Sequence, residues 1–261
     1  MAEKIVFALQ KGGVGKTTST VVTAKILAAA GYKVLVVDFD AQGNATLILT
    51  GGNYYCSFDY TGQTIMEAVE DGNVEKYIVH LTENLDLIPA DDNLAVFSRY
   101  IYTADIERPS EVLKRLLSPV EAKYDFIFVD VGPELGDKAV NAIAYADHII
   151  VPVDCGDLSM DALVRFMNFL ETFQKVGHTE AEVTGILLTM KDGRPLRYER
   201  DVSEGIRDAY GDLVFKTEIR RRVKIKEMSA AGVDVSAVSM DDYAAFTEEI
   251  LERIKGGKDE S

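Results

Sequence analysis

The stretch Lys11–Thr18 reads KGGVGKTT. It follows the apolar run Ile5–Leu9 and precedes a helical pattern over residues 17–30. A G-x-x-x-x-G-K-(S/T) pattern is typical of a phosphate-binding loop when it joins a buried strand to a helix N-terminus. Backbone N–H groups and the positive end of the helix dipole then converge on an anion. A glycine-rich turn without a ligand would explain neither the two lysines nor the threonine pair.

Strand and helix patterns alternate along nearly the whole chain. Buried strands are predicted at Lys33–Asp38, Tyr124–Asp130, His148–Val153 and Val183–Met190, and a long amphipathic helix at Ser159–Lys175. Shorter elements are expected at residues 64–70, 85–89, 94–102, 109–117, 137–145, 201–209, 213–215 and 241–254. The alternation predicts an α/β fold with a mostly parallel, twisted sheet and helices on both faces. We expect one domain over residues 1–255 and a disordered tail over residues 256–261.

Bulk composition excludes several classes of protein. The chain has 261 residues, of which 47% are hydrophobic, and a formal net charge of −15. That length can bury a full core, and that charge argues against a uniformly basic surface. The two cysteines, Cys56 and Cys155, have no metal-site spacing, so neither a disulfide framework nor a zinc site is expected. No apolar run approaches the length of a membrane span, and a cytoplasmic location is expected.

The phosphate-loop pattern departs from the usual spacing at its first position. The first glycine would fall at Gln10, and Lys11 instead stands at the head of the loop, five residues before Lys16. This doubled-lysine form resembles the deviant Walker A loop of the ParA/MinD group of P-loop ATPases. The resemblance covers essentially the full chain and implies a ParA/Soj-like partition ATPase, with ATP and Mg²⁺ as cofactors.

The loop residues are expected to bind the nucleotide. Lys16 would neutralise the β- and γ-phosphates, and the Thr17 hydroxyl would ligate Mg²⁺. By the resemblance, Lys11 reaches across a dimer interface to the partner's nucleotide, whereas the alternative is a solvated lysine beside an anion site. Met190, at the end of its strand, is expected near the base. The candidate nucleotide ligands are therefore Lys11, Gly12, Gly13, Val14, Gly15, Lys16, Thr17, Thr18 and Met190.

A second motif, Asp38–Asn44, reads DFDAQGN and lies at the end of the second predicted strand. Asp38 and Asp40 are separated by one residue at the end of this strand, and we expect the two carboxylates to differ in function. The motif resembles the switch I segment of the ParA family. The resemblance implies that Asp40 orients or activates the attacking water, with Lys11 and Lys16 completing the catalytic set, while Asp38 supports the magnesium. Ala41 replaces the proline usual in the family.

A third motif is the apolar run Phe126–Val129 followed by Asp130, which has the Walker B form. Asp130 is expected to hold Mg²⁺ through water, because this ion keeps part of its hydration shell. The metal candidates are thus Thr17, Asp38 and Asp130. The next residues, Val131–Gly136, depart from the family's Asp-Thr-Pro-Pro or Asp-Cys-Pro-Pro switch II pattern.

A basic segment at residues 216–227 holds six cations against two acids, a local net charge of +4. Taken alone, such a run is most often a solvated helix face. It nevertheless resembles the family's Ile-Pro-Arg-x-Val motif, which implies contacts with DNA phosphates, as does the loop at residues 191–197. Such contacts give affinity without base reading and weaken with salt. The candidate DNA-binding residues are Arg194, Arg197, Arg220, Arg221, Arg222 and Lys224.

Three functions follow from these motifs. The resemblance implies an ATP-dependent homodimer that binds double-stranded DNA nonspecifically, associates with the nucleoid and works with a ParB-like centromere-binding partner. A MinD-like membrane regulator is the first alternative, but residues 246–254 carry three glutamates and one arginine, which anionic lipid would repel. The second is a metal-cluster ATPase of the nitrogenase iron protein type, which needs cysteines near the switch II segment. We therefore predict a partition ATPase that does not bind membranes.

Overall fold

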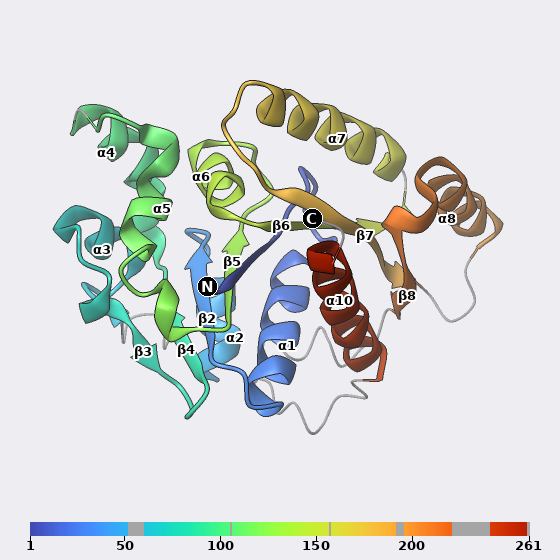
Figure 1. The fold of residues 1–261 in the computed structure, drawn as a ribbon. Helices are drawn as coiled ribbons and strands as arrows, with labels where there is room; N and C mark the ends of the chain where they lie inside the picture. The colour runs from blue at the N-terminus through green and yellow to red at the C-terminus, as the bar shows by residue number, and fades with distance from the viewer. Residues whose placement is uncertain (52–59, 105, 157, 192–195, 221–240, 260–261) are drawn as a thin grey trace.

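An eight-stranded sheet forms the centre of the protein (Figure 1). The computed structural model describes residues 1–261 except 52–59, 105, 157, 192–195, 221–240 and 260–261. The strand order is β3-β4-β2-β5-β1-β6-β7-β8, and every neighbouring pair is parallel except β3 and β4. The strands are β1 Glu3–Phe7, β2 Val34–Phe39, β3 Val79–His80, β4 Leu85–Ile88, β5 Phe126–Val131, β6 His148–Asp154, β7 Glu182–Lys191 and β8 Val214–Arg220.

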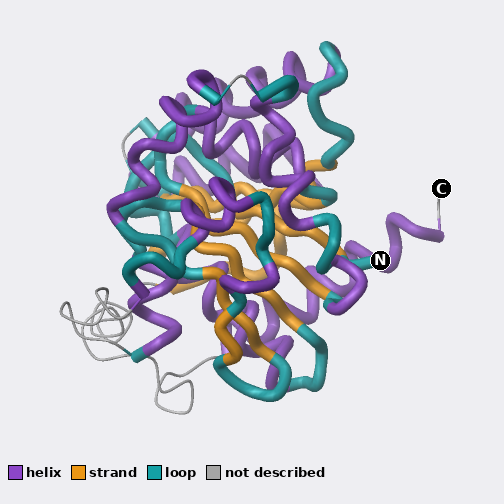
Figure 2. Tube along the Cα trace, turned by 90° about the vertical axis from the view of Figure 1, so that its left-hand side faces the viewer, coloured by secondary structure: helices purple, strands orange, loops and turns teal. Residues whose placement is uncertain are grey.

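Helices cover both faces of this sheet, as the alternating pattern predicts (Figure 2). One face carries α1 Lys16–Ala29, α2 Asn44–Thr50 and α10 Asp241–Asp259, whose apolar side chains share a core with Ile5 and Val36. The other core contains Val6 and Leu35. It is covered by α3 Ile65–Asp71, α4 Phe97–Thr103, α5 Val112–Leu117, α6 Asp137–Tyr145, α7 Ser159–Lys175 and α8 Arg197–Tyr210. Because successive strand residues point to opposite faces, both cores draw on the same strands.

The best-predicted elements are those with strong local signals. Helix α7 has the predicted bounds, and α3 is capped by Thr64, whose backbone N–H donates to Glu67 in a capping box. Gly31, with φ of 96°, follows the end of α1. Tyr32 N–H then donates to Leu27 O at 3.1 Å, which completes a Schellman motif.

Several boundaries differ from the prediction. Single-turn helices at Asp92–Val96 and Pro109–Glu111 begin two segments that the pattern predicted as continuous α-helix. Helix α8 starts at residue 197 rather than 201, and α2 falls in a region for which no element was predicted. Helix α10 continues to Asp259, so residues 256–259 are helical where a disordered tail was expected, and residues 260–261 lie outside the described residues.

Strand β8 contains most of the short strand predicted at residues 213–215 and continues into the basic segment as far as Arg220, where a helix face was the alternative interpretation. It alternates between buried and exposed positions, with Phe215 and Ile219 buried and Lys216 and Arg220 exposed. Arg220 therefore ends an edge strand rather than lying on a helix, because the strand period of two places the apolar side chains on the sheet face. Residues 221–227 lie outside the described residues. Among the described helices, none is long and apolar enough to cross a membrane.

Candidate nucleotide site

The phosphate loop lies between the end of β1 and the start of α1, near the centre of the sheet. In parallel sheets this carboxyl edge is where ligands bind. Gly13 and Gly15 have φ of 76° and 85°, conformations that glycine adopts without strain. Gly15 caps α1 without a side-chain hydrogen bond, and the first turn contains no acidic residue. The helix thus begins without a side-chain cap, as an anion-binding N-terminus requires.

Lys16 is buried within the loop. Its Nζ donates to the carbonyl oxygens of Lys11 at 2.8 Å and Leu9 at 3.3 Å. Burial lowers the pKa of Lys16, while the charges of Asp130 and Asp40 act to raise it. The ammonium therefore lies among loop carbonyls and beside two carboxylates, where it can neutralise an entering phosphate.

Asp130 is the most isolated charge of the site. It is fully buried, and neither carboxylate oxygen has a hydrogen-bond partner within the described part of the chain. Burial and then the charge of Asp38 raise its pKa, whereas the Thr17 hydroxyl and the Lys16 ammonium lower it. A buried carboxylate without a partner costs free energy unless a ligand compensates. Asp130 beside Thr17 therefore fits a magnesium ion, because both supply oxygen to a hard cation.

Asp38 lies opposite Asp130 in the register of β2 and β5. Its Oδ2 accepts hydrogen bonds from the backbone N–H and the hydroxyl of Thr46, both at 2.7 Å. Burial raises the pKa of Asp38 to about 6, against the opposing effect of these hydrogen bonds. The carboxylate thus anchors the first turn of α2 beneath the site, a contact that sequence reasoning missed.

Asp40 follows β2 directly and is partly exposed at the site. Its Oδ1 accepts the backbone N–H of Gln42 at 3.2 Å, which shapes the switch I turn. Its charge acts on Lys16, where it opposes the lowering of the pKa by burial. The structure therefore brings Asp38, Asp40, Asp130 and Lys16 together at one edge of the sheet.

Lys11 is held by the end of β6 and the start of α7. Its Nζ donates to Asp154 Oδ1 at 2.6 Å and to Ser159 Oγ at 2.7 Å, and Ser159 Oγ donates to the same Asp154 oxygen at 2.6 Å. The side chains of Lys11 and Asp154 are each 23% exposed. Sequence reasoning missed both partners; the available signal was that the apolar run of β6 is followed by an acid, Asp154, as the run of β5 is followed by Asp130.

Met190 lies one residue before the end of β7, and its side chain is outside the described residues. The preceding residue, Thr189, is buried and donates its hydroxyl to Val14 O at 2.9 Å. This hydrogen bond joins the end of β7 to the phosphate loop, and the position of Met190 beside the base stays a prediction.

The predicted DNA-binding residues are only partly described. Arg197 is exposed at the start of α8, and Arg220 is exposed at the end of β8. The Arg220 Nε donates to both carboxylate oxygens of Asp242, at 3.1 and 3.2 Å, so its guanidinium is already paired. Arg194, Arg221, Arg222 and Lys224 lie outside the described residues.

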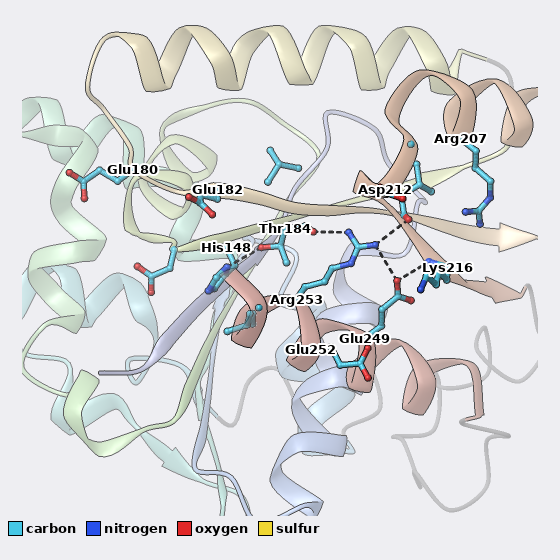
Figure 3. A pocket seen from close by; sticks show the side chains of 16 residues that line it. His148, Glu180, Glu182, Thr184, Arg207, Asp212, Lys216, Glu249, Glu252 and Arg253 are labelled. Atoms are coloured by element: carbon cyan, nitrogen blue, oxygen red, sulfur yellow. Dashed lines mark hydrogen bonds and ion pairs between the residues drawn. The ribbon is translucent and has the colours of Figure 1, made fainter. Parts of the chain in front are cut away.

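A cavity of about 900 Å³ lies at the opposite edge of the sheet, where β6, β7 and β8 begin (Figure 3). The Arg253 guanidinium donates to the carbonyl oxygens of Thr184, Leu213 and Val214 and to Glu249. Glu249 in turn accepts the backbone N–H groups of Lys216 and Thr217, at 2.8 and 3.0 Å. This cavity is remote from the phosphate loop, and these two charged side chains join α10 to β8.

Comparison with known proteins identifies the family of this chain. Residues 2–183 match the AAA domain family. The chain is 36% identical to the sporulation initiation inhibitor protein Soj of Bacillus subtilis, over 89% of each protein. It is 32% identical to the chromosome-partitioning ATPase Soj of Treponema pallidum, over 97% of this chain and 96% of that one.

Among solved structures, the chain resembles a cobyrinic acid a,c-diamide synthase from Mycobacterium smegmatis with bound ADP and magnesium. That protein shares 27% identity and a TM-score of 0.80 over 98% of this chain and 97% of its own. The match over residues 2–183 and the 30–36% identity to Soj and ParA proteins over most of the chain establish the family. The chain belongs to the ParA/Soj-like family of partition ATPases.

Proposed function

We propose that this protein hydrolyses ATP with Mg²⁺, forms a dimer when ATP is bound, and binds DNA nonspecifically in that dimer. One observation carries the proposal: the buried Asp130 carboxylate, which accepts no hydrogen bond of ordinary geometry from the described residues, lies beside Lys16 and Thr17 of a phosphate loop. That arrangement suits a magnesium–nucleotide complex and destabilises a protein without one. The family membership supports partition of plasmid or chromosome DNA as the process served.

The residues of the site divide the chemistry among them. The loop N–H groups and Lys16 would bind the phosphates, and Lys16 would exchange its carbonyl partners for phosphate oxygens. Thr17 and, through water, Asp130 would hold Mg²⁺, which neutralises phosphate charge when bound. Asp38 would fix α2 beneath the metal, and Asp40 would orient the attacking water.

Lys11 supports an exchange between monomer and dimer. In this chain its ammonium is bound by Asp154 and Ser159. To contact the nucleotide of a second copy, Lys11 must leave both partners and gain interactions of comparable strength. An ATP γ-phosphate offers a charge-assisted replacement, and ADP lacks that group. We therefore infer that ATP, and not ADP, shifts Lys11 from its own chain to its partner.

The DNA-binding part of the proposal depends on a local surface, because the chain has a net charge of −15. Arg197 is exposed and is the first candidate among the described residues. Arg220 would have to share or release Asp242 to contact a phosphate. A ParB-like partner would stimulate hydrolysis and so release DNA, with the protein on the nucleoid in the cytoplasm.

A membrane-bound regulator is the weaker alternative. The apolar stripe of α10, formed by Phe246, Ile250 and Ile254, is buried in the core and cannot also enter a bilayer surface. Sedimentation with anionic liposomes should leave the protein in the supernatant with ATP and with ADP. ATP-dependent co-sedimentation would favour this alternative.

The main test measures duplex DNA binding with ATP, ADP and a nonhydrolysable ATP analogue at two salt concentrations. We expect binding only with ATP or the analogue, and a steep loss at the higher salt because phosphate contacts release counterions. Binding without nucleotide, or binding insensitive to salt, would contradict the proposal. Dimer formation is followed in parallel by light scattering.

Lys11→Ala sharpens this test. The variant should lose ATP-dependent dimerisation, turnover and DNA binding. Lys4→Ala is a matched control, because Lys4 lies in the neighbouring strand β1 and pairs with Asp147 at the other edge of the sheet. The control should behave as wild type, and a Lys11→Ala variant that dimerises normally would refute the role of Lys11.

A further inference from the structure

We propose that Gly132 is a positioning residue for Asp40. Because glycine has no β-carbon, the Asp40 carboxylate can lie directly against it. The inference rests on the proposed ATP hydrolysis and deepens it, because it names a residue of the second switch segment that determines where the water-orienting carboxylate is held. Gly132 is also the position at which the sequence leaves the family's proline pattern.

The sheet places these two residues side by side. Asp40 follows β2 and Gly132 follows β5, and the last residues of the two strands, Phe39 and Val131, are paired in register. A β-carbon built at Gly132 would lie 3.1 Å from Asp40 Oδ2, 3.2 Å from Cγ and 3.3 Å from Oδ1. All three atoms of the carboxylate thus lie close to the Gly132 α-carbon. Any side chain at this position would displace the group.

The other side of Asp40 is fixed by its own turn. Its Oδ1 accepts the Gln42 N–H at 3.2 Å, and its carbonyl accepts the Gly43 N–H at 2.9 Å. Gly43 has φ of 59°, and a β-carbon there would lie 2.9 Å from Ala90 O, so the turn itself has little freedom. Gly132 and this turn therefore determine the position of the carboxylate between them.

A cavity beside Asp40 could accommodate its carboxylate if the group were displaced. Asp40 and Gly132 line a cavity of about 450 Å³, together with Ala41, Pro133 and Asp137. A methyl group at residue 132 would move the flexible end of Asp40 toward this space, whereas the backbone of Gly132 has no positive φ that alanine would strain. We therefore expect a folded protein with a misplaced carboxylate. Small misplacements of a reacting group lower rates strongly, because the attack geometry is lost.

The experiment compares Gly132→Ala with Gly136→Ala in the full chain. Gly136 lies in the same loop, but a β-carbon there meets nothing within 4 Å and its φ is −97°. Gly132→Ala should lower kcat about tenfold and leave the Kd of a fluorescent ATP analogue within about twofold of wild type. Gly136→Ala should match wild type in both. Wild-type turnover in Gly132→Ala, or a loss confined to ATP affinity, would overturn the inference.

A double variant shows whether Asp40 mediates the effect. Gly132→Ala should lower the midpoint of thermal unfolding in the wild-type background and not in Asp40→Ala, where the carboxylate is gone. Equal shifts in the two backgrounds would overturn the inference, and this readout does not depend on hydrolysis. If wild-type protein fails to hydrolyse ATP, the proposed function falls, whereas the unfolding comparison still tests the contact.

Discussion

At the starts of β6, β7 and β8, Arg253 and Glu249 satisfy one another and the backbone groups around them. At the ends of β2 and β5, by contrast, Asp38 and Asp130 lie opposite each other, and Asp130 has no hydrogen-bond partner among the described residues. The same sheet therefore has one edge at which half-buried charges are paired and one at which the fully buried Asp130 carboxylate lacks a hydrogen bond within the described part of the chain.

The difference separates charges that hydrogen bonds compensate from carboxylates whose burial is only partly compensated. At the paired edge, burial acts to raise the pKa of Glu249, but hydrogen bonds from the backbone and Arg253 outweigh it and lower the value. At the other edge burial dominates, and the pKa values of Asp38 and Asp130 rise. Uncompensated buried charge is unfavourable in the free protein and is typical of functional sites.

The largest expected effect of a substitution is the loss of ATP turnover on replacing Lys16. Lys16→Ala should lower ATP turnover by about 10² to 10³, because removing a preorganised cationic donor to the transferring phosphate removes transition-state stabilisation. The measurement is single-turnover hydrolysis, with Lys76→Ala, an exposed lysine paired with Asp71, as the control. Lys16→Ala protein that turns over like the control would show that the unpaired edge is not the nucleotide site.

The next effect is expected at the paired edge. Arg253→Ala should lower the free energy of unfolding by about 2–3 kcal/mol, because it removes the donor to three backbone carbonyls and the cation paired with Glu249. ATP affinity should be unchanged in the folded protein. Urea unfolding measures the free energy of unfolding, and a fluorescent nucleotide measures the affinity. Glu252→Ala is the control, because that exposed carboxylate lies in the same helix and lines the same cavity. An equal loss of stability in Glu252→Ala would contradict the stabilising role of Arg253.

The smallest effect on stability is expected from Asp130→Asn. A raised folded-state pKa means that the native protein holds this proton more tightly than the unfolded chain, so Asp130 stabilises the fold only at low pH and that contribution is lost as pH rises. At pH 7 the nucleotide-free Asn variant should be about 1 kcal/mol more stable than wild type. The gap should close toward pH 4, near the ordinary carboxyl pKa of about 3.9.

Unfolding of wild type and Asp130→Asn between pH 4 and pH 7 tests whether the stability difference grows as the pH rises. Asp130→Asn should also lose hydrolysis, so that greater stability accompanies lower activity. A variant that is less stable than wild type at pH 7 would show that Asp130 is compensated in the free protein. Asp125→Asn is the control, because Asp125 is exposed and accepts the Lys33 N–H at the far end of the same strand.

Sequence reasoning succeeded where the signal was local. The spacing of Lys11 and Lys16, the apolar run before Asp130 and the amphipathic period of α7 each lie within one segment, and each was placed correctly. It gave no element at α2, and at β8 it predicted only the first residues of the strand. Helix α2 is short and begins at a turn held by Asp38, whereas β8 mixes charged residues with apolar ones at the edge of the sheet.

The sequence by itself determined the family, the phosphate loop and the identity of the carboxylates, because motifs and periodicity are properties of neighbouring residues. Only the tertiary structure decided the partners of these groups. Asp154 and Ser159 are 143 and 148 residues from Lys11, and they reach it because β6 lies beside β1. Gly132 reaches Asp40 because β5 lies beside β2. Such contacts depend on the order of strands in the sheet, which no local pattern encodes.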